Sequence, residues 1–262
     1  MPVMTIIGCR IFEDEVVHLI EKGPKIEDVI VVDSDNNSGL IRKLNEIGHS
    51  CRLLPLEKIP LISERKDSGR FTLIVDLLEF ALDGFPDKLK EVVYETIERM
   101  KEYSDAVLLL YGLCGNVLGS VEKDFETDGF PVFILTDREG EIVDDCVGAV
   151  LGGRGSFLSK LKSEGTGTYF LTPVGATYWK EMLVASRITP DPDNVEMTKM
   201  VFDYSGYKNV AKVDTGLRYE KEFESKVREF ADRFGFVVVD MEGSPELIER
   251  CYEKAREEVL KK

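Results

Sequence analysis

The chain has 262 residues, of which 43% are hydrophobic, so it is long enough to bury a substantial core and is not expected to be disordered. Its 49 acidic and 34 basic residues give a formal net charge of −15, which argues against a nucleic-acid partner because the chain would repel a phosphate backbone. It holds no run of about 18 apolar residues, and its N-terminus lacks the basic start and long apolar stretch of a secretory signal. We therefore expect a cytoplasmic protein that does not bind a membrane.

Apolar runs alternate with amphipathic segments along the first part of the chain. The runs that predict buried strands cover residues 3–8, 28–33, 49–56, 104–112 and 130–136. Apolar residues at helical spacing predict helices over residues 12–23, 37–48 and 85–103. Residues 57–85 are less regular, and we expect a helix at about 72–82 within them. The alternation is typical of parallel βαβ units.

The last third of the chain alternates in the same way, with strands expected at 168–173, 208–216 and 236–244. We therefore predict an α/β fold, with a mainly parallel sheet of βαβ units flanked by helices on both faces. The chain is expected to form one domain over residues 1–262, with a subdivision near 188–195, where the letters TPDPDN are typical of a turn or linker. Similar strand ends, GCR with GLC and VDTG with VDMEG, are consistent with two related α/β halves.

Five cysteines in a chain without a signal peptide argue against a disulfide framework, because the cytosol keeps thiols reduced. Metal binding, catalysis and packing remain as roles for them. Cys51 lies among leucines and Cys251 lies on a predicted amphipathic helix, so we assign both to packing. With His18 and His49 as the two histidines, a mechanism that needs several histidines is disfavoured.

Cys9, Cys114 and Cys146 each follow a predicted strand and lie beside small residues. The loops at the carboxyl ends of parallel strands share one edge of a sheet, where ligands bind. Glycines beside these cysteines let the backbone approach a ligand, and exposed amides there can donate to thiolate sulfur. Asp144 and Asp145 are placed to cap a helix that carries Cys146 in its first turn. The residues alone leave a shared site and plain packing equally open, because the spacing matches no local metal motif such as CxxC.

Four elements of the chain resemble those of domain-of-unknown-function family sixteen thirty-eight, whose members pair a YGLCGN element with an HDC element. They are IIGCRIFEDE (6–15), YGLCGN (111–116), DDCVGAVLGGRGSFL (144–158) and GTYFLTP (167–173). The resemblance runs over about residues 1–180 and implies that Cys9, Cys114 and Cys146 form a shared metal site. It also implies a role in anaerobic one-carbon metabolism in archaea and bacteria, by association with corrinoid methyltransferases. Asp144 stands where the family has histidine, which puts a histidine ligand or base at that position in doubt.

Three thiolates favour a soft metal centre with one open position. A zinc ion with three cysteine ligands can bind a substrate thiol and lower its pKa for methyl transfer. A [4Fe–4S] cluster held by three cysteines leaves one iron free for substrate. The leading hypothesis is therefore a zinc- or cluster-binding protein, an enzyme or an accessory protein of anaerobic one-carbon metabolism, that acts with a small-molecule substrate or a corrinoid protein. Methyl transfer is the activity that the family resemblance implies for it.

Two other functions remain open at this point. One is a non-catalytic accessory protein that carries a metal, cluster or corrinoid for a partner. The other is thiol redox chemistry, with Cys146 as the attacking thiolate at a helix N-terminus, although Asp144 and Asp145 would oppose the low thiol pKa that this needs.

Further side chains close to the three cysteines are candidates for binding a substrate or cofactor. The glycines of LGGRGS together with Arg154 would bind an anionic group, although a plain turn fits that stretch equally well. Tyr111, Asn116 and Tyr169 belong to the same predicted strands and loops and would line the pocket. For Tyr111, packing within the sheet is the alternative role.

Overall fold

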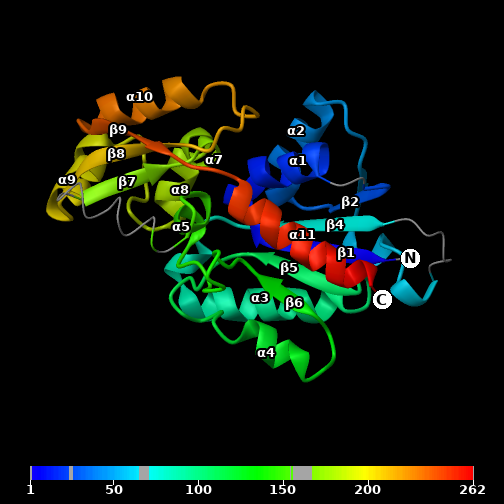
Figure 1. The fold of residues 1–262 in the computed structure, drawn as a ribbon. Coiled ribbons are helices and arrows are strands. Elements are labelled where there is room, and N and C mark those ends of the chain that lie inside the picture. Colours follow the sequence, from blue (N-terminus) through cyan, green and yellow to red (C-terminus); the bar gives the residue numbers. More distant parts are fainter. Residues whose placement is uncertain (1, 24–25, 65–70, 154, 156–166, 262) are drawn as a thin grey trace.

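The computed structural model describes residues 2–23, 26–64, 71–153, 155 and 167–261, and it contains two parallel sheets (Figure 1). The large sheet has six strands in the order β3-β2-β4-β1-β5-β6. Their bounds are β1 (Val3–Cys9), β2 (Asp28–Val32), β3 (Arg52–Leu54), β4 (Thr72–Leu78), β5 (Ala106–Leu110) and β6 (Val132–Ile134). Neighbouring strands pair in parallel throughout, which confirms the predicted α/β fold.

Helices cover both faces of the large sheet, as the sequence predicts (Figure 1). One face packs against α1 (Glu13–Lys22), α2 (Ser38–Glu46) and α11 (Glu246–Leu260). The other packs against α3 (Pro86–Met100) and α4 (Val121–Glu126). Successive strand residues divide between the two cores because side chains alternate along a strand. Among the described residues, no helix is long and apolar enough to cross a membrane.

The expected helix at 72–82 is wrong, because Thr72–Leu78 forms strand β4 in the middle of the sheet. Every residue of this strand is buried, since helices cover both of its faces. A strand buried on both faces shows an unbroken apolar run, which periodicity alone cannot distinguish from a buried helix. After β4 the chain turns away from the sheet at Ala81, which has a left-handed backbone with a φ of 57°.

The small sheet has three parallel strands in the order β7-β8-β9. They are β7 (Gly167–Leu171), β8 (Tyr207–Asp214) and β9 (Val237–Glu242), and they pack with α7 (Pro173–Thr177), α8 (Trp179–Ala185), α9 (Val195–Tyr204) and α10 (Phe223–Phe234). The chain then returns to the large sheet as α11. The proposed subdivision at 188–195 lies between α8 and α9, inside the part built around the small sheet.

A buried ion network joins the two parts. The Lys43 ammonium on α2 lies 2.9 Å from a Glu13 oxygen, 2.6 Å from an Asp14 oxygen and 2.7 Å from an oxygen of Glu220, which precedes α10. Lys43, Glu13 and Asp14 are each no more than 1% exposed. Because a buried charge is costly unless it is paired, this contact fixes the α10 side of the small sheet against α1 and α2.

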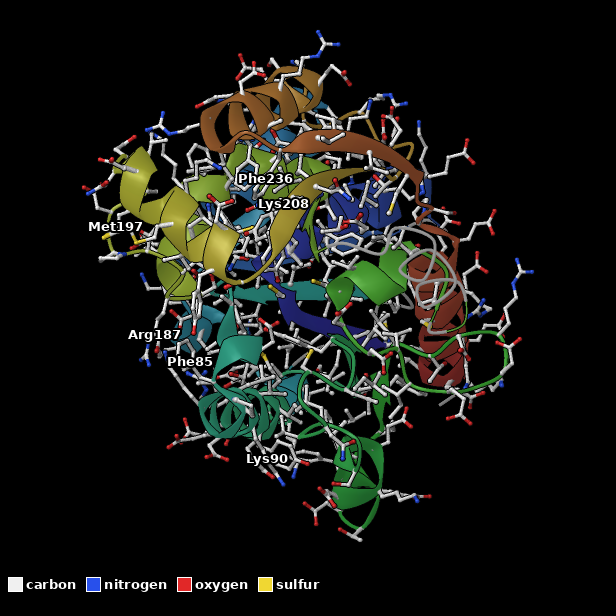
Figure 2. The ribbon with its side chains drawn as sticks, turned by 90° about the vertical axis from the view of Figure 1, so that its left-hand side faces the viewer. Phe85, Lys90, Arg187, Met197, Lys208 and Phe236 are labelled. Carbon is white, nitrogen blue, oxygen red and sulfur yellow. The ribbon has the colours of Figure 1, made fainter. Side chains whose placement is uncertain are left out.

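Two arginines make further contacts between the parts. Arg10, directly after β1, donates to Glu181 of α8 at 2.8 Å and lies over the neighbouring rings of Phe80 and Tyr178. Arg187, which follows α8, stacks 4.1 Å from the ring centroid of Phe85 (Figure 2). Both contacts lie beside the loops that follow β1 and β4, so they help to hold that edge of the large sheet.

Candidate metal centre

Cys9 is the last residue of β1, which lies between β4 and β5 in the large sheet. The loops that follow these three strands are therefore neighbours at the carboxyl edge, the position where open α/β sheets bind ligands. Burial raises the pKa of the Cys9 thiol to about 12, and hydrogen bonds from the backbone of Ile11 and Ala81 oppose that rise. Ala81 comes from the loop after β4, so Cys9 is already bound to the neighbouring loop.

Cys114 lies in a left-handed turn that follows β5. The φ angles of Cys114, Gly115 and Asn116 are 45°, 77° and 66°. Cysteine rarely adopts this conformation, and such strain is typical of functional sites, where the surrounding structure must compensate for it. The Cys114 side chain is only 6% exposed, and burial raises the pKa of its thiol to about 12.

Two backbone hydrogen bonds join the Cys114 loop to the segment that precedes Cys146. The Leu113 amide donates to the Val143 carbonyl at 2.8 Å, and the Cys114 amide donates to the Asp144 carbonyl at 2.9 Å. The approach requires glycine at position 112, since a Cβ there would lie 2.3 Å from the Val143 carbonyl oxygen. Gly112, the first glycine of YGLCGN, thus allows two loops that lie far apart in the sequence to come together.

Cys146 is the first residue of α5 (Cys146–Val150), as the sequence predicts. Asp145 caps this helix, with its Oδ1 accepting from the Gly148 amide at 2.7 Å. Burial raises the pKa of Cys146 well above its ordinary value, and Asp145, Cys9, Asp83 and Cys114 raise it further. Cys146 therefore shares its surroundings with both other cysteines.

Tyr111 lies among the same groups. Its side chain is 3% exposed, and its hydroxyl has no hydrogen-bond partner among the described residues. Burial raises the pKa of Tyr111 well above its ordinary value, and Cys9, Cys114, Asp83 and Cys146 add to the rise. The three cysteines that the sequence places at one edge thus all act on the same buried phenol.

Asp83 is a residue of this site that the sequence analysis missed. It lies in a short 3-10 helix, Leu82–Gly84, after β4, and its side chain is exposed. Its charge raises the pKa of Cys9, Cys114 and Tyr111. Because we expected residues 72–82 to be helical, no strand end was assigned in front of Asp83, and the correct strand would have placed it at the carboxyl edge.

Tyr169 belongs to β7 of the small sheet, and its ring stacks on Phe230 with centroids 5.2 Å apart. Burial raises its pKa, and Tyr207, Cys146 and Asp83 raise it further, so of the three cysteines it is Cys146 that acts on Tyr169. Asn116 is exposed in the left-handed turn, and no contact between its side chain and the cysteines is found in the described part of the chain. Arg154 lies outside the described residues.

The other two cysteines lie apart from this site. Cys251 is buried in α11, where its thiol donates to the Thr136 carbonyl at 3.4 Å. Cys51 directly precedes β3, which is separated from β1 by the two strands β2 and β4. His18 pairs with Glu249 beside a pocket of about 380 Å³ between α1 and α11.

The donor set fits a thiophilic metal, although it does not form a closed ligand shell. Three soft thiols share the site with acidic neighbours, and backbone amides supply hydrogen bonds to the sulfur of Cys9. Within the described ranges, however, no three cysteine, histidine or acidic side chains are arranged to hold a metal ion. Sulfurs that share one zinc ion lie about 3.8 Å apart, given tetrahedral Zn–S bonds. Zinc would therefore require the side chains to close up, whereas a cluster, whose irons separate its ligands, is compatible with a wider spacing.

The model of the family described as "Protein of unknown function (DUF1638)" matches residues 77–252. The chain belongs to this family. The DUF1638 match contains Asp83, Tyr111, Cys114, Cys146 and Tyr169, and it ends within the first half of α11. It begins after β1, so Cys9 lies outside it. No curated protein and no solved structure matches the chain.

Proposed function

We propose that this DUF1638 protein binds a zinc ion or a [4Fe–4S] cluster through Cys9, Cys114 and Cys146, and that it takes part in methyl transfer to a thiol. The observation that carries the proposal is that Cys9, Cys114 and Cys146 come from three loops and all act on the buried, unpartnered hydroxyl of Tyr111. The neighbours that act on these thiols, Asp83 and Asp145 among them, are negative when ionised. A bound cation would compensate these charges and permit the thiols to ionise.

A different structural feature positions each of the three cysteines. Backbone amides from two loops orient the Cys9 sulfur, the left-handed turn fixes Cys114, and the Asp145 cap sets the start of the helix that carries Cys146. When bound, the metal centre would supply an open position at which a substrate thiol loses its proton.

The methyl donor and acceptor follow from the family resemblance and from the chemistry of a thiolate-bound metal. A methylated corrinoid protein would donate the methyl group and a small-molecule thiol would accept it. Asp83 and Asn116 are exposed, whereas Cys114 is buried and Cys9 and Cys146 are half-buried, so a partner would meet the site at Asp83 and Asn116. An accessory protein that only carries the metal, cluster or corrinoid is the second candidate, and it differs in lacking the transfer activity.

Redox chemistry of the free thiols is disfavoured by their surroundings. A thiol attacks a disulfide as its thiolate, and reactive cysteines therefore lie in electropositive positions that lower their pKa. Here burial and acidic neighbours raise the pKa of all three.

Anaerobic purification followed by metal analysis tests the proposal. We expect about one zinc ion, or a brown protein with iron and sulfide, for each chain. The variants Cys9→Ala, Cys114→Ala and Cys146→Ala should each lose most of the metal, and Cys51→Ala is the matched control that should keep it. Metal content that survives all three substitutions would exclude these ligands. If metal is present, an assay of methyl transfer from a methylated corrinoid to a thiol distinguishes the two functions. An enzyme is active in this assay, and a carrier is not.

A further inference from the structure

Helix α9 has an inner face that anchors it to the part built around the small sheet. Thr198 and Phe202 are buried on this face. The centroid of the Phe202 ring lies 5.0 Å from that of Phe236 and 5.3 Å from that of Phe234. The inner face therefore holds the helix in the fold, and the opposite face is not needed for packing within one chain.

The outer face of α9 is apolar as well. Four side chains, spaced so that they follow one another along the helix, form what we call the α9 stripe: Met197, Met200, Val201 and Tyr204. Tyr204 is 94% exposed, Met200 68% and Val201 36%. Figure 2 shows Met197 on the outer side of α9, and α9 lies at the outer end of the small-sheet part (Figure 1). Single exposed apolar residues are ordinary, but a continuous stripe marks a surface that binds another protein.

The charges beside the α9 stripe differ between its two ends. Glu196, at the start of the helix, is exposed and forms no ion pair within the described part of the chain. Near the end of the helix, oxygens of Asp203 lie 3.1 Å from the Lys199 ammonium and 2.8 Å from that of Lys208. Two lysines thus share one carboxylate, which leaves this end with an excess positive charge. Glu196 and Asp203 are two helical turns apart, so both groups of charges border the same side of the stripe.

A second copy of the chain fits this pattern when the two α9 helices are antiparallel. A two-fold axis then passes between the midpoints of the helices, where Met200 and Val201 of each copy meet. Each Glu196 lies at the end of the other helix, beside the excess positive charge. A parallel pair would instead place Glu196 against Glu196, and like charges that face each other oppose association. Of the two arrangements, the antiparallel one is therefore the self-complementary one.

We infer that the α9 stripe is the interface of a homodimer, in which two copies of the chain pack their α9 helices antiparallel about a two-fold axis. The inference goes beyond the proposed function, and it uses neither the cysteines nor the metal centre. Four apolar side chains from each copy bury less than a standard interface of about 1,600 Å², so we expect weak association, with a dissociation constant on the order of micromolar. The two copies join through their small-sheet parts.

Sedimentation velocity of the full chain, over concentrations that extend to hundreds of micromolar, tests the inference. The mass should rise from that of a monomer to that of a dimer and no further, because a two-fold interface is closed. Met200→Glu and Tyr204→Glu should each weaken association by about tenfold or more, since each places charge in the apolar contact. Both side chains are exposed in one copy, so circular dichroism should show the native fold and melting temperature.

Val237→Glu is the matched control. Val237 is also apolar and 65% exposed, but it begins β9, an edge strand of the small sheet. This variant should dimerise as the native protein does. A dimer that Val237→Glu dissociates and Met200→Glu does not would place the interface at the edge of the small sheet, which overturns the inference.

A charge exchange tests the antiparallel arrangement. Glu196→Lys and Lys208→Glu should each weaken association by about threefold, because each places like charges at both ends of the interface. The double variant restores opposite charges and should dimerise nearly as well as the native protein. A role of either side chain within one copy would not produce this rescue. A double variant that associates no better than the single ones would overturn the antiparallel arrangement.

The mass of the native protein gives the remaining outcomes. A chain that stays monomeric at every concentration would overturn the inference, even if a different protein binds α9. Growth beyond a dimer would also overturn it, because that requires an interface that does not close. Equal dimerisation of metal-free and metal-loaded protein is expected, so a failure of the proposed metal site would leave this inference intact.

Discussion

The Cys114 amide donates to the carbonyl of Asp144 at 2.9 Å, and this bond connects the two loops that carry Cys114 and Cys146. The contact is made by the backbone, so it does not depend on the side chain of position 144. The histidine that the family resemblance implies at position 144 is therefore not needed to bring the loops together. The aspartate found there leaves the approach of Cys114 to the second loop intact.

Gly112→Ala should disrupt this contact. A Cβ at position 112 would lie 2.3 Å from the Val143 carbonyl oxygen and 2.9 Å from the Asp145 nitrogen, and both are backbone atoms that cannot turn away. We expect a loss of about 1–3 kcal/mol in the free energy of unfolding, together with weaker metal retention. Urea denaturation and metal analysis provide the measurements.

Gly84→Ala is the matched control, because no atom lies within 4 Å of the Cβ that it would add. This variant should have nearly the same free energy of unfolding and the same metal content as the native protein. Equal stability of the two variants would mean that the Leu113–Val143 pairing is not made in solution.

Substitutions of Cys114 separate its backbone role from its role as a ligand. The φ of 45° at this position is unfavourable for any residue with a Cβ, by about 1–2 kcal/mol. Cys114→Gly should therefore be more stable than Cys114→Ala by about 1 kcal/mol in the metal-free state. Both should lose the metal equally. A Cys114→Ala protein that is the more stable of the two would contradict the left-handed turn.

The sequence predicted every strand of the two sheets except β4, and it predicted the edge of the large sheet, but it did not predict the contacts across that edge. Cys9 and Cys146 were placed at a strand end and in a helix first turn from local patterns, because alternation and capping are local properties. The Gly112–Val143 approach and the position of Asp83 depend on pairing between distant segments. No local pattern contains that information, and β4, whose residues are all buried, lacked the alternation that would have identified it.

Asp83→Asn should make the thiols more reactive in the metal-free protein. The carboxylate raises the pKa of Cys9 and Cys114, in addition to the larger effect of burial. Removing its charge should lower both values, and a shift of half a pKa unit would raise the thiolate fraction about threefold. Alkylation rates of the peptides that contain Cys9 and Cys114, measured by mass spectrometry at pH 9, give the result.

Asp87→Asn is the control for this experiment, since Asp87 is exposed in the first turn of α3. It should leave both alkylation rates unchanged. If Asp83→Asn leaves the alkylation rates of Cys9 and Cys114 unchanged, the Asp83 carboxylate lies too far from these thiols to raise their pKa.

Glu15 on α1 should make the stability of the protein depend on pH. Its side chain is 3% exposed, and burial raises its pKa to about 8, with Asp14 adding to the rise and Lys43 opposing it. The unfolded chain has an ordinary glutamate pKa of about 4.3. Between these two values the folded protein holds a proton that the unfolded chain has released, so stability falls as the pH rises.

Glu15→Gln should remove this dependence, because glutamine resembles the protonated acid and does not titrate. The variant should match the native protein near pH 4 and exceed its stability increasingly up to pH 8, by at most about 1.4 kcal/mol for each pH unit. Urea denaturation across this range measures the difference, with the exposed Glu91→Gln on α3 as the control. A difference between Glu15→Gln and native protein that stays constant with pH would mean that Glu15 is ionised in the folded state, with Lys43 compensating its charge.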